Sequence, residues 1–178
     1  MPTCPRCAAL ALLLLALAGC DSNNPGRDLD LIEGVYTLES ITFVSSTPRL
    51  DPIKVSDRLD LPNSTLEIFG DDETSILRIR YLPGSSGSVR NSNRVDLNTT
   101  ASRGRATFEV AGADRSSDTE ALEAILLPPS FTLTYEGDTP RTLSGTFDQV
   151  VNLEAYDPEG YRNIRDNPGT LTVRFRRP

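Results

Sequence analysis

The sequence contains no histidine and no tryptophan, and only 3 of its 178 residues are cysteine. Histidine is the usual general base, a common metal ligand and the side chain that changes charge near neutral pH. Its absence excludes Ser-His-Asp and Cys-His catalytic sites. We therefore expect that the protein is not an enzyme and that it binds neither a cofactor nor a metal ion. Paired carboxylates are the remaining catalytic alternative, and no local motif indicates them.

Positive charge is also scarce, since 18 lysines and arginines oppose 25 aspartates and glutamates, for a net charge of −7. An acidic surface disfavours nucleic acid, because the phosphate backbone repels it. We expect no nucleic-acid partner, and no pattern in the sequence specifies an oligomeric state.

The longest apolar run covers residues 8–18, which is shorter than the roughly 20 apolar residues needed to span a bilayer. Arg6 precedes the run and the polar segment 21–26 follows it. This length and these flanks are typical of an export signal. The C-x-x-C formed by Cys4 and Cys7 lies ahead of the expected cut, so we expect it to be removed with the signal.

The end of this run, Leu17-Ala18-Gly19-Cys20, resembles the lipobox of bacterial lipoproteins. The resemblance implies cleavage before Cys20 and acylation of its thiol, for example with palmitate. Two or more acyl chains anchor a protein stably to a membrane. The lipobox resemblance further implies that the folded domain lies in the periplasm or at the cell surface. Asp21 resembles an inner-membrane retention signal of enteric bacteria, but we expect an outer-membrane anchor rather than an inner one. The alternative is an ordinary signal peptide with an incidental cysteine.

Beyond the signal peptide, residues 1–19, we expect a lipidated cysteine with a polar tether, residues 20–30, and one folded domain, residues 31–178. In that domain apolar residues alternate with polar ones, which is the period of a β-strand with one wet face. The clearest predicted strands cover residues 34–43, 65–69, 75–82, 105–110, 131–136, 143–153 and 170–176. A strand over residues 89–100 has weaker support, because few of its residues are apolar.

One segment carries a helical signal. Ser117 and Glu120 form a capping box, and Leu122, Ile125 and Leu126 follow at helical spacing. A short helix is therefore predicted here, ending before Pro128. A strand over residues 124–127 is the alternative.

About eight strands with one apolar face each predict an all-β fold, either a single antiparallel barrel or a two-sheet sandwich. The segment Gly34-Val35-Tyr36-Thr37-Leu38 looks like the first strand of the bacterial lipocalin-like lipoproteins. That resemblance implies an eight-stranded barrel over the domain, and the short helix predicted from the capping box departs from its simple meander.

The lipocalin resemblance also implies that the barrel interior holds a small apolar or amphipathic ligand. The inward-facing candidates for this ligand site are Tyr36, Leu38, Tyr81, Phe108, Tyr135 and Phe147. The alternative is that these side chains are simply core. The second functional hypothesis is a β-sandwich interaction module that contacts another envelope protein or a polysaccharide.

Two pairs of arginines stand two residues apart in predicted strands, Arg78 with Arg80 and Arg174 with Arg176. On neighbouring strands the four guanidinium groups would grip an anion. We favour cross-strand ion pairs with glutamates instead.

Overall fold

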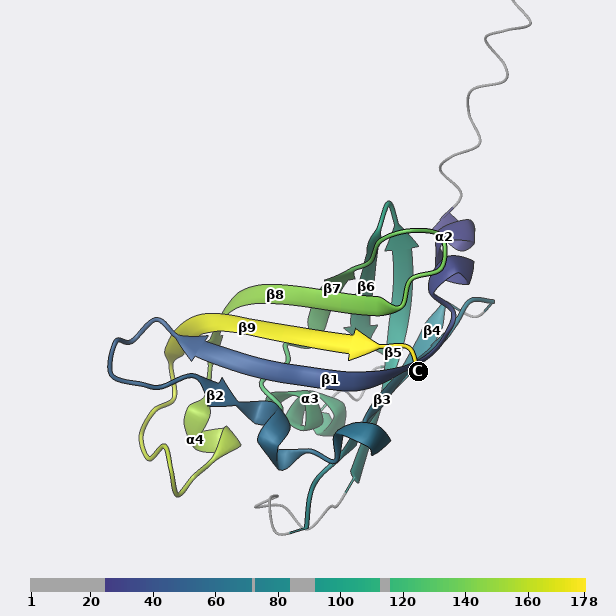
Figure 1. Cartoon of the computed structure of the whole chain (residues 1–178). Helices are drawn as coiled ribbons and strands as arrows, with labels where there is room; N and C mark the ends of the chain where they lie inside the picture. The colour runs from purple at the N-terminus through teal and green to yellow at the C-terminus, as the bar shows by residue number, and fades with distance from the viewer. Residues whose placement is uncertain (1–24, 72, 84–91, 113–115) are drawn as a thin grey trace, which may run out of the picture.

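The computed structural model describes residues 25–71, 73–83, 92–112 and 116–178 (Figure 1). The lipobox residues Leu17, Ala18, Gly19 and Cys20 lie outside this part of the chain. The described strands are β1 (Gly34–Ser45), β2 (Ile53–Lys54), β3 (Thr65–Phe69), β4 (Thr74–Arg80), β5 (Ser92–Ser102), β6 (Arg105–Val110), β7 (Ser130–Thr134), β8 (Thr142–Val151) and β9 (Asn167–Arg176). The helices are α2 (Pro25–Ile32), α3 (Ser116–Glu123) and α4 (Leu153–Tyr156), with 3-10 turns η1 (Val55–Arg58) and η2 (Leu61–Asn63).

The sheet is antiparallel and closes on itself. Its strand order is β2-β1-β3-β4-β5-β6-β7-β8-β9, and pairing of β1 with β9 completes a barrel of eight strands with β2 as an extra strand. Strand β1 can serve three neighbours because it is long and carries a register shift between Leu38 and Ser40, where it bends. The predicted all-β barrel is confirmed, and the two-sheet alternative is not what the chain forms.

Side chains fill the barrel. Alternate residues of each strand point inward, as the period-two pattern predicts. The largest fully buried side chains include Tyr36, Phe43, Phe108 and Phe175. A barrel of eight strands is just wide enough for side chains to fill it.

The two ends of the barrel carry different helices (Figure 1). At the α2 end, where β1 begins and β9 ends, helix α2 inserts Leu29 and Ile32 into the core. Asp28 there accepts a hydrogen bond from the backbone N–H of Arg103, in the turn between β5 and β6. At the opposite end, the α3 end, helix α3 and the chain after it bury Leu122 and Leu127.

Several elements differ from the sequence predictions. Residues 25–30, expected to belong to the tether, form most of α2, because Leu29 and Ile32 share one helical face and reach the core. The helix predicted from the capping box is confirmed as α3, and the strand over residues 124–127 is wrong. The short elements β2, α4 and the two 3-10 turns were not predicted.

Candidate functional site at the seam between β7 and β8

The six predicted ligand residues lie on the inner side of the barrel wall, but only one of them reaches its surface. Five are buried, with at most 8% of each side chain exposed: Tyr36, Leu38, Tyr81, Phe108 and Tyr135. Phe147, on β8, is half-buried. The burial of the five is what core packing requires, and their ligand role stays a prediction.

Phe147 belongs to an aromatic row at the boundary between β7 and β8. The ring of Phe131 stacks on Phe108 at 5.2 Å between centroids and meets Phe147 edge-on at 6.4 Å. The three rings come from β6, β7 and β8, and only the last is partly open to solvent. The row therefore marks a point where the packed interior meets the surface.

At that point the barrel wall is incomplete, and the boundary between β7 and β8 is here called the seam. Strand β8 pairs with β9 along its whole length, from Thr142 to Val151, whereas it pairs with β7 only at Thr134 and Ser144. Gly145 lies at the next contact, where a Cβ atom would come within 2.8 Å of the carbonyl oxygen of Thr132. Beyond this close approach the two strands form no further pairs in the described residues.

The outer side of the seam is hollowed. A groove of about 890 Å³ extends over β7, β8 and the neighbouring strands. Serines and threonines are the most numerous residues of its lining, and two exposed arginines, Arg105 and Arg174, also line it. A row of cross-strand partners connects these two residues: Arg105 lies opposite Thr134, Thr134 opposite Ser144, and Ser144 opposite Arg174.

The seam continues into a second hollow at the α3 end, here called the α3 cleft. Its volume is about 460 Å³, within the range of 300–1,000 Å³ typical of small-molecule sites. One wall is the chain from α3 to β7 and the other is the end of β8. The lining residues are Glu123, Leu126, Leu127, Pro128, Pro129, Gln149, Val150, Val151, Asn152, Arg165 and Asp166.

The α3 cleft combines accessible apolar surface with polar groups. Pro129 is exposed and Val150 is 63% exposed, an unusual fraction for a valine in a strand. Across the cleft, the side-chain amide of Gln149 donates a 2.6 Å hydrogen bond to the carbonyl oxygen of Leu126. Leu126 has a left-handed backbone, with φ of 60°, which is rare for a residue with a branched side chain. This hydrogen bond ties the turn after α3 to β8.

Sequence reasoning missed the α3 cleft, although the sequence of β8 contains a signal for it. Leu143, Gly145 and Phe147 occupy inward positions, so the alternation places Gln149 inward and Val150 outward. A polar residue at an inward position beside an exposed apolar one inverts the pattern of the strand. Such an inversion is typical of a segment of the barrel wall that departs from the usual pattern of apolar residues inside and polar residues outside.

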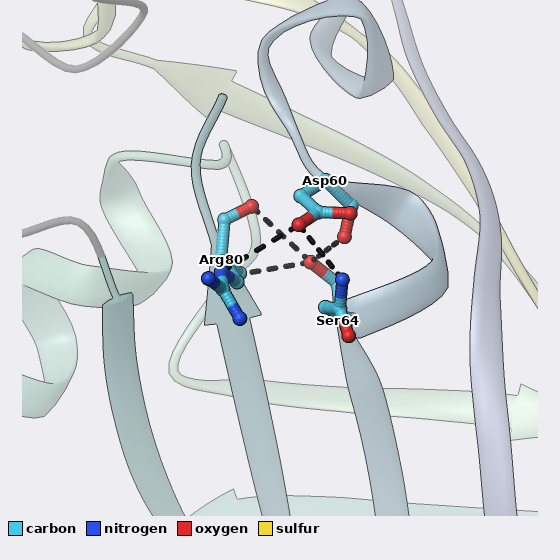
Figure 2. Close-up of polar contacts among 4 residues, drawn as sticks. Asp60, Ser64 and Arg80 are labelled. Carbon is cyan, nitrogen blue, oxygen red and sulfur yellow. Dashed lines mark hydrogen bonds and ion pairs between the residues drawn. The ribbon is translucent and has the colours of Figure 1, made fainter. Parts of the chain in front are cut away.

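A second polar cluster, drawn in Figure 2, is structural. The Ser64 hydroxyl is buried at the start of β3. It donates toward the carbonyl oxygens of Asp60 and Arg80, at 3.0 and 3.3 Å, and accepts a 3.0 Å hydrogen bond from the N–H of Arg80. Asp60 also lies 3.5 Å from the Arg80 guanidinium. With backbone groups as its partners, this hydroxyl joins the ends of β3 and β4 rather than serving as a nucleophile.

The four arginines do not form one anion site. Strands β1 and β3 separate β9, which carries Arg174, from β4, which carries Arg78. Arg78 pairs with Glu67 at 2.6 Å, and Arg174 pairs with Glu39 at 2.7 Å. Cross-strand ion pairs with glutamates therefore account for Arg78 and Arg174, as we favoured from the sequence.

Burial shifts the titration of the tyrosines in the core. Desolvation raises the pKa values of Tyr36, Tyr81 and Tyr135 above the ordinary value. Arg177 opposes the shift at Tyr36, since its guanidinium donates a 2.8 Å hydrogen bond to the phenol oxygen. These groups are neutral at physiological pH and supply no acid or base to the α3 cleft.

Among the described residues there is no helix long and apolar enough to cross a membrane. Within the same ranges, no group of three or more Asp, Glu, His or Cys side chains is placed to hold a metal ion.

Comparison with known proteins adds little. No protein-family model matches the sequence, and no curated protein matches it. A solved structure of an uncharacterized protein from Bacteroides eggerthii is similar over 82% of this chain and 98% of its own, with a TM-score of 0.40 and 8% sequence identity. We draw no argument about fold or function from that likeness.

Proposed function

We propose that this protein is a bacterial envelope lipoprotein whose lipocalin-like barrel binds a small apolar or amphipathic molecule in the α3 cleft, without catalysis. The observation that carries the ligand proposal is the cleft itself. It presents Pro128, Pro129 and Val150 beside the polar groups of Gln149 and Asn152. An apolar wall with a few convergent polar groups is the common composition of small-molecule sites. The packed interior argues for this cleft over the centre of the barrel.

The anchor proposal rests on the lipobox, and the fold gives it a geometric consequence. Helix α2 begins at Pro25, five positions after Cys20. Five residues span at most about 17 Å when fully extended. An acylated Cys20 would therefore hold the α2 end of the barrel close to the bilayer and leave the α3 cleft facing away from it.

The anchor is tested in growing cells by labelling with radioactive palmitate. We expect the wild-type band to carry the label and to sediment with membranes, in the outer-membrane fraction. The Cys20→Ser variant should lose both properties. A wild-type band without label, or a variant that stays equally membrane-bound, would overturn the anchor proposal.

Ligand binding is tested separately with the fluorescent probe 1-anilinonaphthalene-8-sulfonate, using the full chain with Cys20→Ser. Placing a charge on the apolar wall by Val150→Asp should weaken probe binding about fivefold, the effect of losing about 1 kcal/mol of apolar contact. Val44→Asp is the matched control, because Val44 is also an exposed strand valine, at 48%, but lies outside the cleft. Equal probe binding by both variants would contradict the proposed site.

The native ligand is sought by mass spectrometry of the protein purified from its own host under non-denaturing conditions. We expect a co-purifying molecule that is absent from the Val150→Asp variant. A protein that always carries an unmodified mass would count against a carrier function.

A further inference from the structure

The groove on the outer side of the seam is bordered by parts of β7 and β8 that, in the described residues, have no strand partner on the seam side beyond the Thr134–Ser144 pair. In an antiparallel pair, alternate residues direct both N–H and C=O toward the same neighbour. On β7, the bonds from Val110 N–H to Pro129 C=O and from Tyr135 N–H to Gly104 C=O show that odd-numbered residues face β6. Ser130 and Thr132 therefore direct their backbone groups toward β8.

The same rule assigns the edge of β8. The bond from Arg177 N–H to Arg141 C=O belongs to the β8–β9 ladder, so odd-numbered residues of β8 face β9. Even-numbered residues then face β7. Ser144 pairs with Thr134 as this rule requires, but Thr146, Asp148 and Val150 have no strand partner in the described residues. These three residues form a free strand edge, here called the β8 edge.

A free strand edge of this kind can pair with an extended polypeptide. Its N–H and C=O groups repeat every two residues, and an extended polypeptide presents the same groups at the same spacing. Natural proteins normally cover or charge such edges, because they template pairing with another chain. Along the β8 edge only Asp148 is charged, and its carboxylate accepts a hydrogen bond from Thr170 on β9.

The charges around the groove give the incoming chain a direction. Arg105 is exposed and forms no ion pair within the described residues. Arg174, which is exposed and already lies 2.7 Å from Glu39, stands on the other side of the same row, so Arg105 carries the uncompensated charge. Arg105 on β6 and Arg174 on β9 are both in register with Ser144, near the start of β8. A strand antiparallel to β8 runs toward this end, so its C-terminal part meets the two arginines. A carboxylate there would be favoured by charge.

We propose that the seam accepts an extended polypeptide segment as an additional strand, hydrogen-bonded antiparallel to the β8 edge, with a carboxylate at its C-terminal end facing Arg105 and Arg174. This site does not require the lipid anchor or a small molecule in the α3 cleft, although Val150 belongs both to the β8 edge, through its backbone, and to the wall of the cleft, through its side chain. Failure of either earlier experiment leaves it standing. It makes the protein a peptide-binding module of the strand-addition type.

The free edge is tested first without any variant, by amide hydrogen exchange on the full chain carrying Cys20→Ser. We expect the amides of Thr146, Asp148 and Val150 to exchange at least about a hundredfold faster than those of Phe147 and Gln149, which donate to β9. Equal protection of the two sets would mean that the β8 edge is already paired, and the proposal would be overturned.

Peptide binding is tested with a displayed library of linear heptapeptides with free C termini, selected on the same protein. Thr146→Pro removes one N–H from the β8 edge without touching the β8–β9 ladder, and Thr146→Val is the matched control that keeps it. We expect selected peptides to bind Thr146→Pro about tenfold more weakly and Thr146→Val normally. Circular dichroism confirms that each variant is folded.

The peptides themselves provide the second readout. N-methylation of alternate residues should abolish binding, whereas N-methylation of the intervening residues should not, because only alternate N–H groups face β8. Arg105→Gln should weaken peptides with a free C terminus and leave amidated ones unchanged, with Arg78→Gln on β4 as its control. A selection that yields no peptide, or peptides insensitive to Thr146→Pro and to N-methylation, would overturn the proposal.

Discussion

Strand β8 has two different edges. Toward β9 it pairs at all ten positions from Thr142 to Val151, and toward β7 it pairs at one. The same residues therefore form both the longest ladder of the barrel and, with β7, its shortest one between consecutive barrel strands in the described part of the chain. The difference shows that most of the pairing that closes this barrel lies in the wall made by β8, β9 and β1, and little of it at the seam beside β7.

The largest effect should come from removing a ring inside the paired wall. Phe175 is fully buried between Leu38 of β1 and Leu143 of β8. Phe175→Ala should lower the free energy of unfolding by about 3–5 kcal/mol, because it leaves a cavity with no means of collapse. Phe147→Ala at the seam should lower it by only about 1–2 kcal/mol, since that ring is half-buried. Urea unfolding measures both, and equal losses would contradict the distinction between the two edges.

Substitutions at two glycines, Gly169 and Gly145, test the difference between the two edges of β8 at the backbone. A Cβ on Gly169 would meet the carbonyl oxygen of Val44 and the ring of Phe43, both held in the paired wall. Gly169→Ala should therefore destabilise the fold by about 1–3 kcal/mol, as overpacking does.

A Cβ on Gly145 would meet the ring of Phe147 at 2.5 Å and the carbonyl oxygen of Thr132 at 2.8 Å. The Phe147 ring is half-buried and is able to move. The Thr132 carbonyl belongs to backbone paired with β6, but β7 and β8 form no further pairs beyond this point in the described residues, so the two strands are able to separate slightly here. Gly145→Ala should cost less than about 1 kcal/mol, a smaller loss than at Gly169. Thermal unfolding of the two variants gives the comparison, and a larger loss at Gly145 would mean that the seam is the more rigid wall.

The sequence predicted the closed part of the barrel better than the seam. Leu171, Val173 and Phe175 alternate with polar residues, and their inward direction follows from period two alone. Gly145 lies where β7 and β8 separate. The separation itself was not predictable, because it depends on pairing between strands that each satisfy the pattern equally well.

The α3 cleft was missed for a related reason. Its walls come from the turn after α3 and from the end of β8, and no local pattern states that these segments meet. Helix α2 was missed differently. Leu29 and Ile32 are three positions apart and follow Pro25, which is a valid helix signal, but the surrounding polar residues favoured a tether.

A smaller effect should appear at alkaline pH, where the tyrosines test whether the two walls unfold together. Burial raises the pKa of Tyr36 in β1 and of Tyr135 after β7. In the unfolded chain a tyrosine ionises near pH 10. The stability contributed by the neutral phenols is therefore complete below about pH 10 and is lost as the pH rises toward the folded values.

This titration is followed by tyrosinate absorbance and circular dichroism together. If the walls unfold as one unit, ionisation of the buried phenols coincides with loss of the fold. Tyr135→Phe then lowers the amplitude of the absorbance change, and the absorbance and circular dichroism transitions keep the same midpoints relative to each other. Absorbance that rises well before the circular dichroism changes, and that Tyr135→Phe abolishes, would instead show the seam opening first.

The smallest effect should come from the side-chain hydrogen bonds that hold β8 on its two sides. On the seam side, Gln149 donates to the carbonyl oxygen of Leu126, and Gln149→Met leaves that oxygen without this partner. The expected loss is about 1 kcal/mol. On the paired side, Thr170 donates to the exposed carboxylate of Asp148, and Thr170→Val should cost less than about 0.5 kcal/mol because water replaces the bond and the ladder remains. Chemical unfolding resolves the two, and hydrogen exchange adds a spatial test. Gln149→Met should speed exchange in the turn after α3 alone, so faster exchange throughout β9 would show that the two edges of β8 are not independent.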